Sequence, residues 1–221
     1  MTNTNALDVY NKLMEFYGPV DWRPPLSPVD ELVSTILSQS TTDLNRDRAF
    51  KRLKERFGSW EAVMKGDVAD IETAIRVAGL FRQKAPRIKA ALQFVYNSQG
   101  AFSLDFLKTL PVEEACVWLT QMHGVGVKTA SIILLFSLGM PAFPVDTHVH
   151  RITKRLGLIP PKASAEKAHY ILEEALPPET CLNAHLNLIR LGREICRARN
   201  PKCEVCPLNE MCAYYQLAMA N

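Results

Sequence analysis

The chain has 221 residues, a net charge of +3 and 48% hydrophobic residues, a length that accommodates one large domain or two small ones. The longest apolar run, residues 130–140, is interrupted by two serines and a glycine, so no membrane-spanning helix is expected. The N-terminus has no basic region followed by an apolar core, so no secretion signal is expected and the composition indicates an intracellular protein. Thiols stay reduced inside the cell, which disfavours disulfides among the six cysteines.

Apolar residues recur at helical spacing through most of the chain, and no pair of candidate strands stands out. The first predicted helix spans Ala6–Tyr17, and three prolines within residues 24–28 then break the chain. Pro28 opens the second predicted helix, with Ser27 as its N-cap. Further helices are predicted at Asp43–Phe57, Ser59–Lys65, Val68–Val77, Phe81–Tyr96, Leu104–Thr109, Val112–Met122, Lys128–Leu138, Thr147–Leu156, Ala165–Ala175 and Glu179–Glu194. The sequence therefore predicts an all-α protein with short connections.

Two of these helical stretches are strongly basic. Residues 46–56 contain six basic and two acidic side chains, and residues 76–89 contain five basic side chains and no acidic one. Each stretch alone is compatible with a solvated helix face. Together with a basic loop near the C-terminus, they favour a surface that binds nucleic acid.

A Gly-Val-Gly turn at Gly124, Val125 and Gly126 lies between two predicted amphipathic helices, and Lys128 follows at the start of the second. Glycine permits positive φ and close backbone approach. The N–H groups at the following helix N-terminus are a favourable site for an anion such as a DNA phosphate. A helical turn that binds no ligand is the alternative, because Gly-x-Gly alone is a weak signal. Asp146 precedes another predicted helix, where an N-cap is its commonest role.

Four cysteines near the C-terminus follow a C-x6-C-x2-C-x5-C spacing, and three basic residues lie between the first two of them. The cysteines are Cys196, Cys203, Cys206 and Cys212, and the basic residues are Arg197, Arg199 and Lys202. Thiolates this close in sequence can bind one inorganic centre, and the spacing alone is compatible with tetrahedral zinc as well as with an iron–sulfur cluster. The basic side chains are placed to contact phosphates.

Three motifs occur in a fixed order: Gly-Val-Gly-x-Lys-Thr-Ala from Gly124, Val-Asp-Thr-His-Val-x-Arg from Val145, and the four-cysteine spacing. With Ile36–Asp43 and Gly79–Ala85, they make nearly the whole chain resemble the endonuclease III family of helix-hairpin-helix DNA glycosylases. The resemblance implies a [4Fe–4S] cluster on the four cysteines. It also implies two helical domains with a DNA-binding cleft between them. One is a six-helix domain at residues 27–136 that carries the hairpin, and the other is an iron–sulfur cluster domain formed by residues 1–26 and 137–221.

The resemblance further implies a catalytic pair. Lys128 matches the family's nucleophile, which attacks the anomeric carbon of the damaged nucleotide, expels the base and forms a Schiff base that permits β-elimination. Asp146 matches the essential carboxylate, which stabilises the charge developing on the sugar and assists proton transfers. The protein is therefore expected to be a bifunctional DNA glycosylase and AP lyase that excises oxidised pyrimidines in base-excision repair.

Access to a lesion requires the nucleotide to leave the duplex, and side chains must fill the gap that it leaves. Leu80 matches the apolar residue that family members use for this purpose. Many members have Gln at the second filling position, whereas this chain has Ser40 there and Gln39 one residue earlier. Because a hydroxyl side chain fills less of the gap, the opposite-base preference is expected to differ.

Two other functions remain open from the sequence. One is a monofunctional glycosylase that removes adenine or thymine from mismatches, and the other is a catalytically silent protein that binds DNA structures through the hairpin and the cluster. The intact Lys128 and Asp146 favour the bifunctional enzyme. The expected partner is double-stranded DNA with damaged bases or abasic sites, bound by a monomer without membrane contact. In a prokaryote this places the protein in the cytoplasm with the nucleoid.

Overall fold

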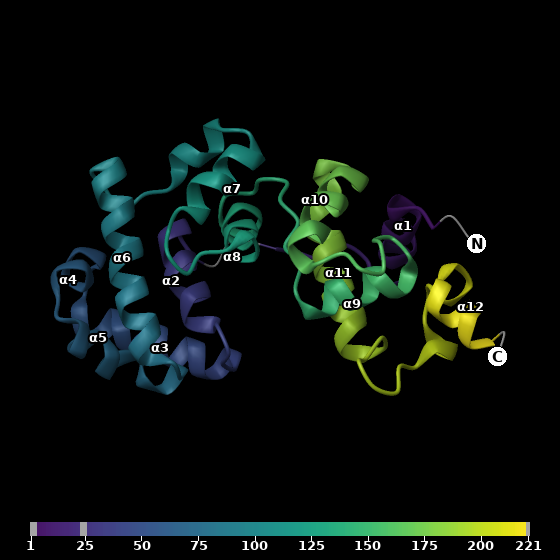
Figure 1. The fold of residues 1–221 in the computed structure, drawn as a ribbon, viewed down its shortest axis with the longest axis horizontal. Coiled ribbons are helices and arrows are strands. Elements are labelled where there is room, and N and C mark those ends of the chain that lie inside the picture. Colours follow the sequence, from purple (N-terminus) through teal and green to yellow (C-terminus); the bar gives the residue numbers. More distant parts are fainter. Residues whose placement is uncertain (1–3, 23–25, 220–221) are drawn as a thin grey trace. The chain divides into compact units, whose positions relative to one another are not determined.

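The computed structural model describes residues 4–22 and 26–219, and every regular element within them is helical (Figure 1). The chain divides into two compact units, each described separately below. The central unit is Pro24–Gly139, and the terminal unit combines Met1–Arg23 with Met140–Asn221. The domain boundaries expected from the resemblance were 27–136 for the first and 1–26 with 137–221 for the second. The predicted break falls partly on residues 23–25, which lie outside the described residues.

The helix starts follow from local capping chemistry. A side-chain oxygen at the N-cap accepts a hydrogen bond from an otherwise unsatisfied backbone N–H two or three residues later. Ser27 does this for Asp30 N in α2, and Thr42 does it for Asn45 N in α3. Because caps are encoded within a few residues, the predicted bounds of Ala6–Tyr17, Asp43–Phe57, Thr147–Leu156 and Ala165–Ala175 match the structure to the residue.

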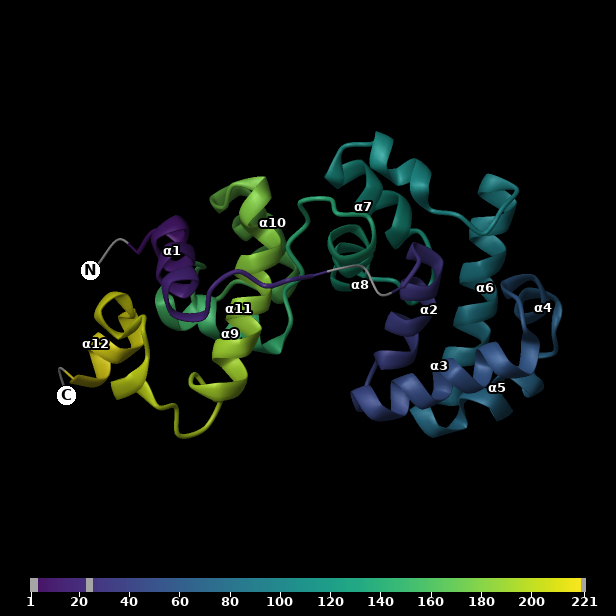
Figure 2. The same cartoon turned by 180° about the vertical axis from the view of Figure 1, so that it is seen from behind.

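The central unit is built around its longest helix. In chain order its elements are α2 (Pro28–Ser38), α3 (Asp43–Phe57), α4 (Trp60–Lys65), α5 (Val68–Ile75), the 3₁₀-helix η1 (Arg76–Ala78), α6 (Phe81–Gln99), the 3₁₀-helix η2 (Asp105–Thr109), α7 (Val112–Thr120), α8 (Val127–Ile132) and the π-helical η3 (Ile133–Ser137). Helix α6 packs against α2, α4 and α5, as both views show (Figures 1 and 2). Fully buried Ile88, Leu92 and Val95 form its inner face.

The terminal unit joins the first helix of the chain to its last third. Its elements are α1 (Ala6–Tyr17), α9 (Thr147–Leu156), α10 (Ala165–Ala175), the 3₁₀-helix η4 (Pro178–Thr180), α11 (Cys181–Glu194), the 3₁₀-helices η5 (Cys203–Val205) and η6 (Asn209–Met211), and α12 (Ala213–Met219). Helices α9 and α11 pack closely where Gly192 meets His148, because a Cβ at Gly192 would lie 2.7 Å from His148 Nδ1. Helices α1 and α12 pack on α11 and α9, respectively.

Several predicted elements differ from the structure at their ends. Helix α6 continues three residues beyond Tyr96 to Gln99 and ends where Gly100 adopts positive φ, a common helix terminator. The segment predicted as one helix, Lys128–Leu138, is α8 followed by the π-helical η3. Helix α12 was not predicted, because its seven residues are too few to give a clear periodic pattern. None of the described helices combines the length and apolar character needed to cross a membrane.

Candidate functional site

The predicted hairpin is present between α7 and α8. Gly124 has φ +85°, a region that disfavours any residue with a side chain. A Cβ at this position would also lie 2.7 Å from Arg87 Cδ. Gly124 is therefore required both for the turn and for the close approach of α6. Gly126, the N-cap of α8, is exposed and has open space around its Cα.

Lys128 lies in the first turn of α8, where its side chain is exposed. The N–H groups of Val127 and Lys128 in this first turn have no intrahelical acceptor. They point out of the helix end and can donate to an anion. Val125 differs from the prediction, because its side chain is buried and its N–H donates to Met122 O at 3.0 Å. The predicted anion site is thereby reduced to the N–H groups that follow Val125.

The Gln39 side chain makes hydrogen bonds within the protein. Its Nε2 donates to the carbonyl of Gly124 at 3.0 Å, and its Oε1 accepts from Arg87 Nη1 at 3.3 Å. The side chain thus fastens the turn after α2 to the hairpin. In this conformation the Gln39 side chain is held by protein groups, whereas its neighbour Ser40 is exposed.

Ser40 and Leu80 share an unusual backbone conformation. Their φ values are 52° and 47°, in the left-handed region where L-residues with side chains are strained. Leu80 is 49% exposed although it is a large apolar residue, and Ser40 is also exposed. Strained residues of this kind persist only where surrounding contacts hold them. The two side chains expected to fill a gap in DNA are therefore both presented to solvent by constrained turns.

The basic stretches contribute less free charge than the sequence indicated. In residues 46–56, four of the six basic side chains pair with carboxylates. Arg46, for example, contacts both Asp43 and Asp47. In residues 76–89, Lys84 is 1% exposed and donates only into the protein. Any surface for polyanions on the central unit therefore uses only part of these stretches.

Asp146 caps α9 in the terminal unit. Its Oδ1 accepts a hydrogen bond from Val149 N at 2.8 Å, so the predicted N-cap is present. The bond fixes one carboxylate oxygen and leaves Oδ2 available for other partners. The next residue but one, His148, contacts Arg151 Nη2 through Nδ1 at 3.1 Å and packs against Gly192.

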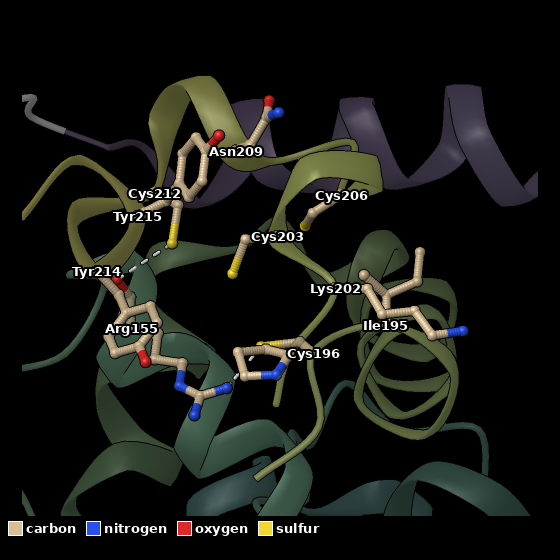
Figure 3. Close-up of a pocket in the computed structure, with 11 residues that line it drawn as sticks. Arg155, Ile195, Cys196, Lys202, Cys203, Cys206, Asn209, Cys212, Tyr214 and Tyr215 are labelled. Atoms are coloured by element: carbon tan, nitrogen blue, oxygen red, sulfur yellow. Dashed lines mark hydrogen bonds between the residues drawn. The ribbon is translucent and has the colours of Figure 1, made fainter. Parts of the chain in front are cut away.

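The four cysteines of the predicted metal site line one cavity (Figure 3). Arg155, Ile195 and Tyr214 are among the other residues that line it. Among the described residues, no group of three or more His, Cys, Asp or Glu side chains is arranged to bind a single metal ion. Four thiols around a common cavity form a donor set that fits an iron–sulfur cluster, whose iron atoms are each held by one thiolate.

Burial raises the pKa of the Cys206 thiol to about 11 and also raises the pKa of Cys203. The neighbouring cysteines add to both effects, because one thiolate disfavours another. Protein atoms alone therefore favour the protonated thiol at Cys203 and Cys206. Bound iron reverses this preference, because a metal ion stabilises the thiolate that coordinates it.

Two arginines of α9 brace the cysteine loop, residues 196–212. Arg151 donates to Cys196 O at 2.8 Å, and Arg155 donates to Arg197 O at 2.8 Å and Ala198 O at 3.1 Å. Arg155 Nη1 also lies 3.2 Å from Cys196 Sγ, and its guanidinium stacks on the Tyr214 ring. The sequence did not single out Arg155, since its partners are backbone carbonyls more than 40 residues away. The predicted contact residues Arg197, Arg199 and Lys202 are exposed on this loop.

Two family models match the chain. The model of the HhH-GPD superfamily of base excision DNA repair proteins matches residues 33–178. The model of the iron–sulfur binding domain of endonuclease III matches residues 196–212, the span that begins and ends with the outer two cysteines. The second match decides between the two centres that the cysteine spacing left open, in favour of iron–sulfur.

The chain is also similar to individual proteins. It is 34% identical to endonuclease III of Thermotoga maritima over 86% of this chain and 84% of that protein. It is 39% identical to a proposed DNA glycosylase of Arabidopsis thaliana, of which it spans 65% of the length, over 82% of its own. A solved structure described as a trapped endonuclease III–DNA covalent intermediate superposes with a TM-score of 0.81 at 26% identity, covering 98% of this chain and 99% of that one. The expected all-α fold and the family resemblance are both confirmed.

Proposed function

The chain belongs to the endonuclease III family of the HhH-GPD superfamily, and on this premise we propose that Lys128 and Asp146 carry its reaction. The family membership makes the protein a DNA glycosylase with AP lyase activity that carries a [4Fe–4S] cluster. Its preferred lesion and its individual site residues are the proposals developed here. The observation that carries them is Lys128, which stands exposed in the first turn of α8 directly after the hairpin.

Lys128 can act as the nucleophile because nothing in the described structure occupies it. Among the described residues no ion pair involves its amine, and its side chain is exposed, so no ion pair has to break before the amine attacks a sugar carbon. In the proposed reaction its nitrogen forms a bond to the anomeric carbon while the glycosidic bond breaks and the base departs. The bond between the anomeric carbon and the ring oxygen then breaks, the ring oxygen takes up a proton, and the adduct becomes a Schiff base. The Schiff base acidifies the neighbouring sugar carbon, so that loss of a proton there expels the 3′ phosphate.

Asp146 is proposed to stabilise the positive charge that develops on the sugar. Its capping bond from Val149 N at 2.8 Å fixes the carboxylate in one orientation. A preorganised carboxylate stabilises a developing cation without reorganising during the reaction. Its second oxygen can also accept and return the protons that the two steps require.

The hairpin and the cysteine loop are proposed to hold the DNA backbone. The first N–H groups of α8 would bind one phosphate, and exposed Arg197, Arg199 and Lys202 would bind others. The four cysteines would hold the cluster, which supplies a rigid inorganic core to the loop. Neither reaction step needs electrons from it.

The proposed substrates are oxidised pyrimidines and abasic sites in double-stranded DNA, recognised by a monomer. In a prokaryotic cell such a substrate would keep the protein at the nucleoid. Ser40 in place of the longer Gln supports an opposite-base preference that differs from that of related enzymes, because a smaller side chain fills the gap beside the orphaned base. A panel of duplexes with thymine glycol, dihydrouracil, uracil or a mismatch would rank the lesions.

Borohydride trapping on a duplex with an abasic site tests the nucleophile. We expect wild type to form a covalent adduct and Lys128→Ala to lose at least about 100-fold in trapping rate, a loss typical for removal of a nucleophile or an acid–base group. Asp146→Asn should retain DNA binding and reduce base release by a similar factor. Base release from a mismatch without any adduct would instead identify a monofunctional glycosylase, and binding without either activity would identify a silent DNA-binding protein.

A further inference from the structure

Lys84 is a buried lysine to which the reaction assigns no role. It lies in the first turns of α6 with 1% of its surface exposed. Its Nζ donates to Leu37 O and to Ala78 O, both at 2.8 Å. Lys84 forms no ion pair among the described residues, so these two carbonyls are the partners of its amine. Burying a lysine is costly, and such residues persist where their hydrogen bonds hold something in place.

The two carbonyls belong to different helix ends. Leu37 is the last residue but one of α2, and Ala78 is the last residue of η1. Carbonyls at helix C-termini lack intrahelical partners and carry partial negative charge. Leu37 and Ala78 are both fully buried, so water cannot satisfy these groups. The Lys84 side chain donates to both carbonyls in place of water, so one nitrogen atom connects the end of α2 to the end of η1.

Each tied carbonyl lies just before a strained residue. Ser40, with φ 52°, follows Leu37 by three positions, and Leu80, with φ 47°, follows Ala78 by two. Leu80 O in turn accepts from Lys84 N at 3.0 Å, so backbone and side chain of the same lysine both hold this turn. Burial lowers the pKa of Lys84, yet the ammonium and the neutral amine can each donate two hydrogen bonds. Lys84 can therefore make both hydrogen bonds in either protonation state.

We propose that Lys84 is a positioning residue that fixes the spacing between the Ser40 turn and the Leu80 turn, so that both side chains enter the same gap in a duplex. The proposal rests on the proposed function, since it assumes that these two residues fill the space left by an extruded nucleotide. Lys84 itself touches no DNA. Lys84 fixes the positions of Ser40 and Leu80 before DNA binds, so binding loses no conformational entropy in ordering these two turns.

The test uses Lys84→Met in the cluster-loaded chain of 221 residues, because Met keeps most of the buried volume and removes both hydrogen bonds. The matched control is Lys89→Met, which removes a lysine of the same helix whose Nζ donates to Gly66 O at 2.7 Å, away from both turns. Binding is measured on a duplex with a tetrahydrofuran abasic analogue and on the undamaged duplex. A 2-aminopurine opposite the analogue reports how the gap is filled.

We expect Lys84→Met to bind the analogue duplex about tenfold more weakly, within the contribution of one stacked side chain, while the undamaged duplex is bound as by wild type. The 2-aminopurine response should fall with it, and Lys89→Met should change neither quantity. Leu80→Ala should weaken binding of the analogue duplex selectively as well, and the double variant Lys84→Met/Leu80→Ala should lose less than the product of the two single losses. Equal weakening on both duplexes, or losses that multiply in the double variant, would overturn the positioning role.

A second variant covers the case in which Lys84→Met does not fold. Lys84→Gln retains N–H donors on a shorter side chain that cannot span both carbonyls, so preference for the analogue duplex should fall by a smaller factor. An unchanged preference would contradict the proposal. The binding assay involves no chemistry, whereas borohydride trapping of wild type on a duplex with an abasic site reports the reaction itself. Absence of that adduct would overturn the proposed function and leave the spacing result standing by itself.

Discussion

The turns at Ser40 and Leu80 and the cysteine loop are both irregular segments with strained backbone, but they are held by different means. Among the described residues, the non-glycine positions with positive φ are Ser40, Leu80 and Asn200, the last within the cysteine loop. The two turns of the central unit are fixed by protein groups alone, through Lys84 and the contact between Gln39 and Gly124. The cysteine loop surrounds a cavity lined by four thiols.

The protein's own hydrogen bonds hold the two turns of the central unit, whereas the cysteine loop needs a bound group in its cavity. In the turns, each buried carbonyl has a donor, so their conformation requires no added group. In the loop, Arg155 and Thr4 donate to backbone carbonyls, but burial raises the pKa of Cys206 and Cys203, two of the thiols that line the cavity. The loop should therefore depend on the cluster, and the turns should not.

The largest effect is expected on removing a cluster ligand. Cys206→Ser should destabilise the cysteine loop by more than about 4–5 kcal/mol, the range in which loss of a metal is a recognised cause. Hydrogen exchange measured by mass spectrometry should show lost protection in residues 196–219 and retained protection in α2 and α6. The visible absorbance of the iron–sulfur cluster should disappear in parallel.

The matched control for the ligand is Cys181→Ser, which changes a buried cysteine of the same unit outside the cavity. It should keep the cluster absorbance. Equal loss of protection in the central and terminal units of Cys206→Ser would remove the distinction between the two segments.

An intermediate effect is expected at the arginine brace. Arg155→Met removes two bonds to loop carbonyls, the contact with Cys196 Sγ and the stacking on Tyr214, so we expect a loss of about 2–3 kcal/mol and faster cluster release to a chelator. Thermal unfolding and chelator kinetics measure the two quantities. Lys154→Met, a neighbouring cation without a bond to the loop among the described contacts, should behave as wild type in both. Equal thermal unfolding and equal rates of cluster release for the two variants would show that the Arg155 contacts do not stabilise the loop.

The smallest effect is expected in the hairpin that supports the turns. Gly124→Ala places a Cβ at φ +85° and 2.7 Å from Arg87 Cδ, so roughly 1–2 kcal/mol of strain should appear, together with weaker contact between Arg87 and Gln39. Urea unfolding measures the loss. Gly126→Ala adds a Cβ in open space at negative φ, and its stability should stay within about 0.5 kcal/mol of wild type. Equal stability of the two variants would show that Arg87 yields without cost.

The sequence by itself determined most of the helices, the caps at Ser27 and Asp146 and the order of the chemical motifs. These are local properties: Ser27 and Asp146 each cap a helix through an N–H group three residues away, and apolar spacing marks the buried faces. The hairpin glycines and the cysteine spacing were equally local. For this reason the fold class and the family could be predicted from the sequence, and the family resemblance implied the cluster.

Only the tertiary structure determined which groups the long polar side chains contact. Lys84 and Arg82 stand in one basic stretch, but Lys84 is buried against carbonyls at positions 37 and 78, while Arg82 remains exposed. Gln39 bonds to Gly124, 85 residues away, and Arg155 bonds to a loop more than 40 residues away. A flexible side chain reaches whichever acceptor packing brings near, and composition does not encode that choice.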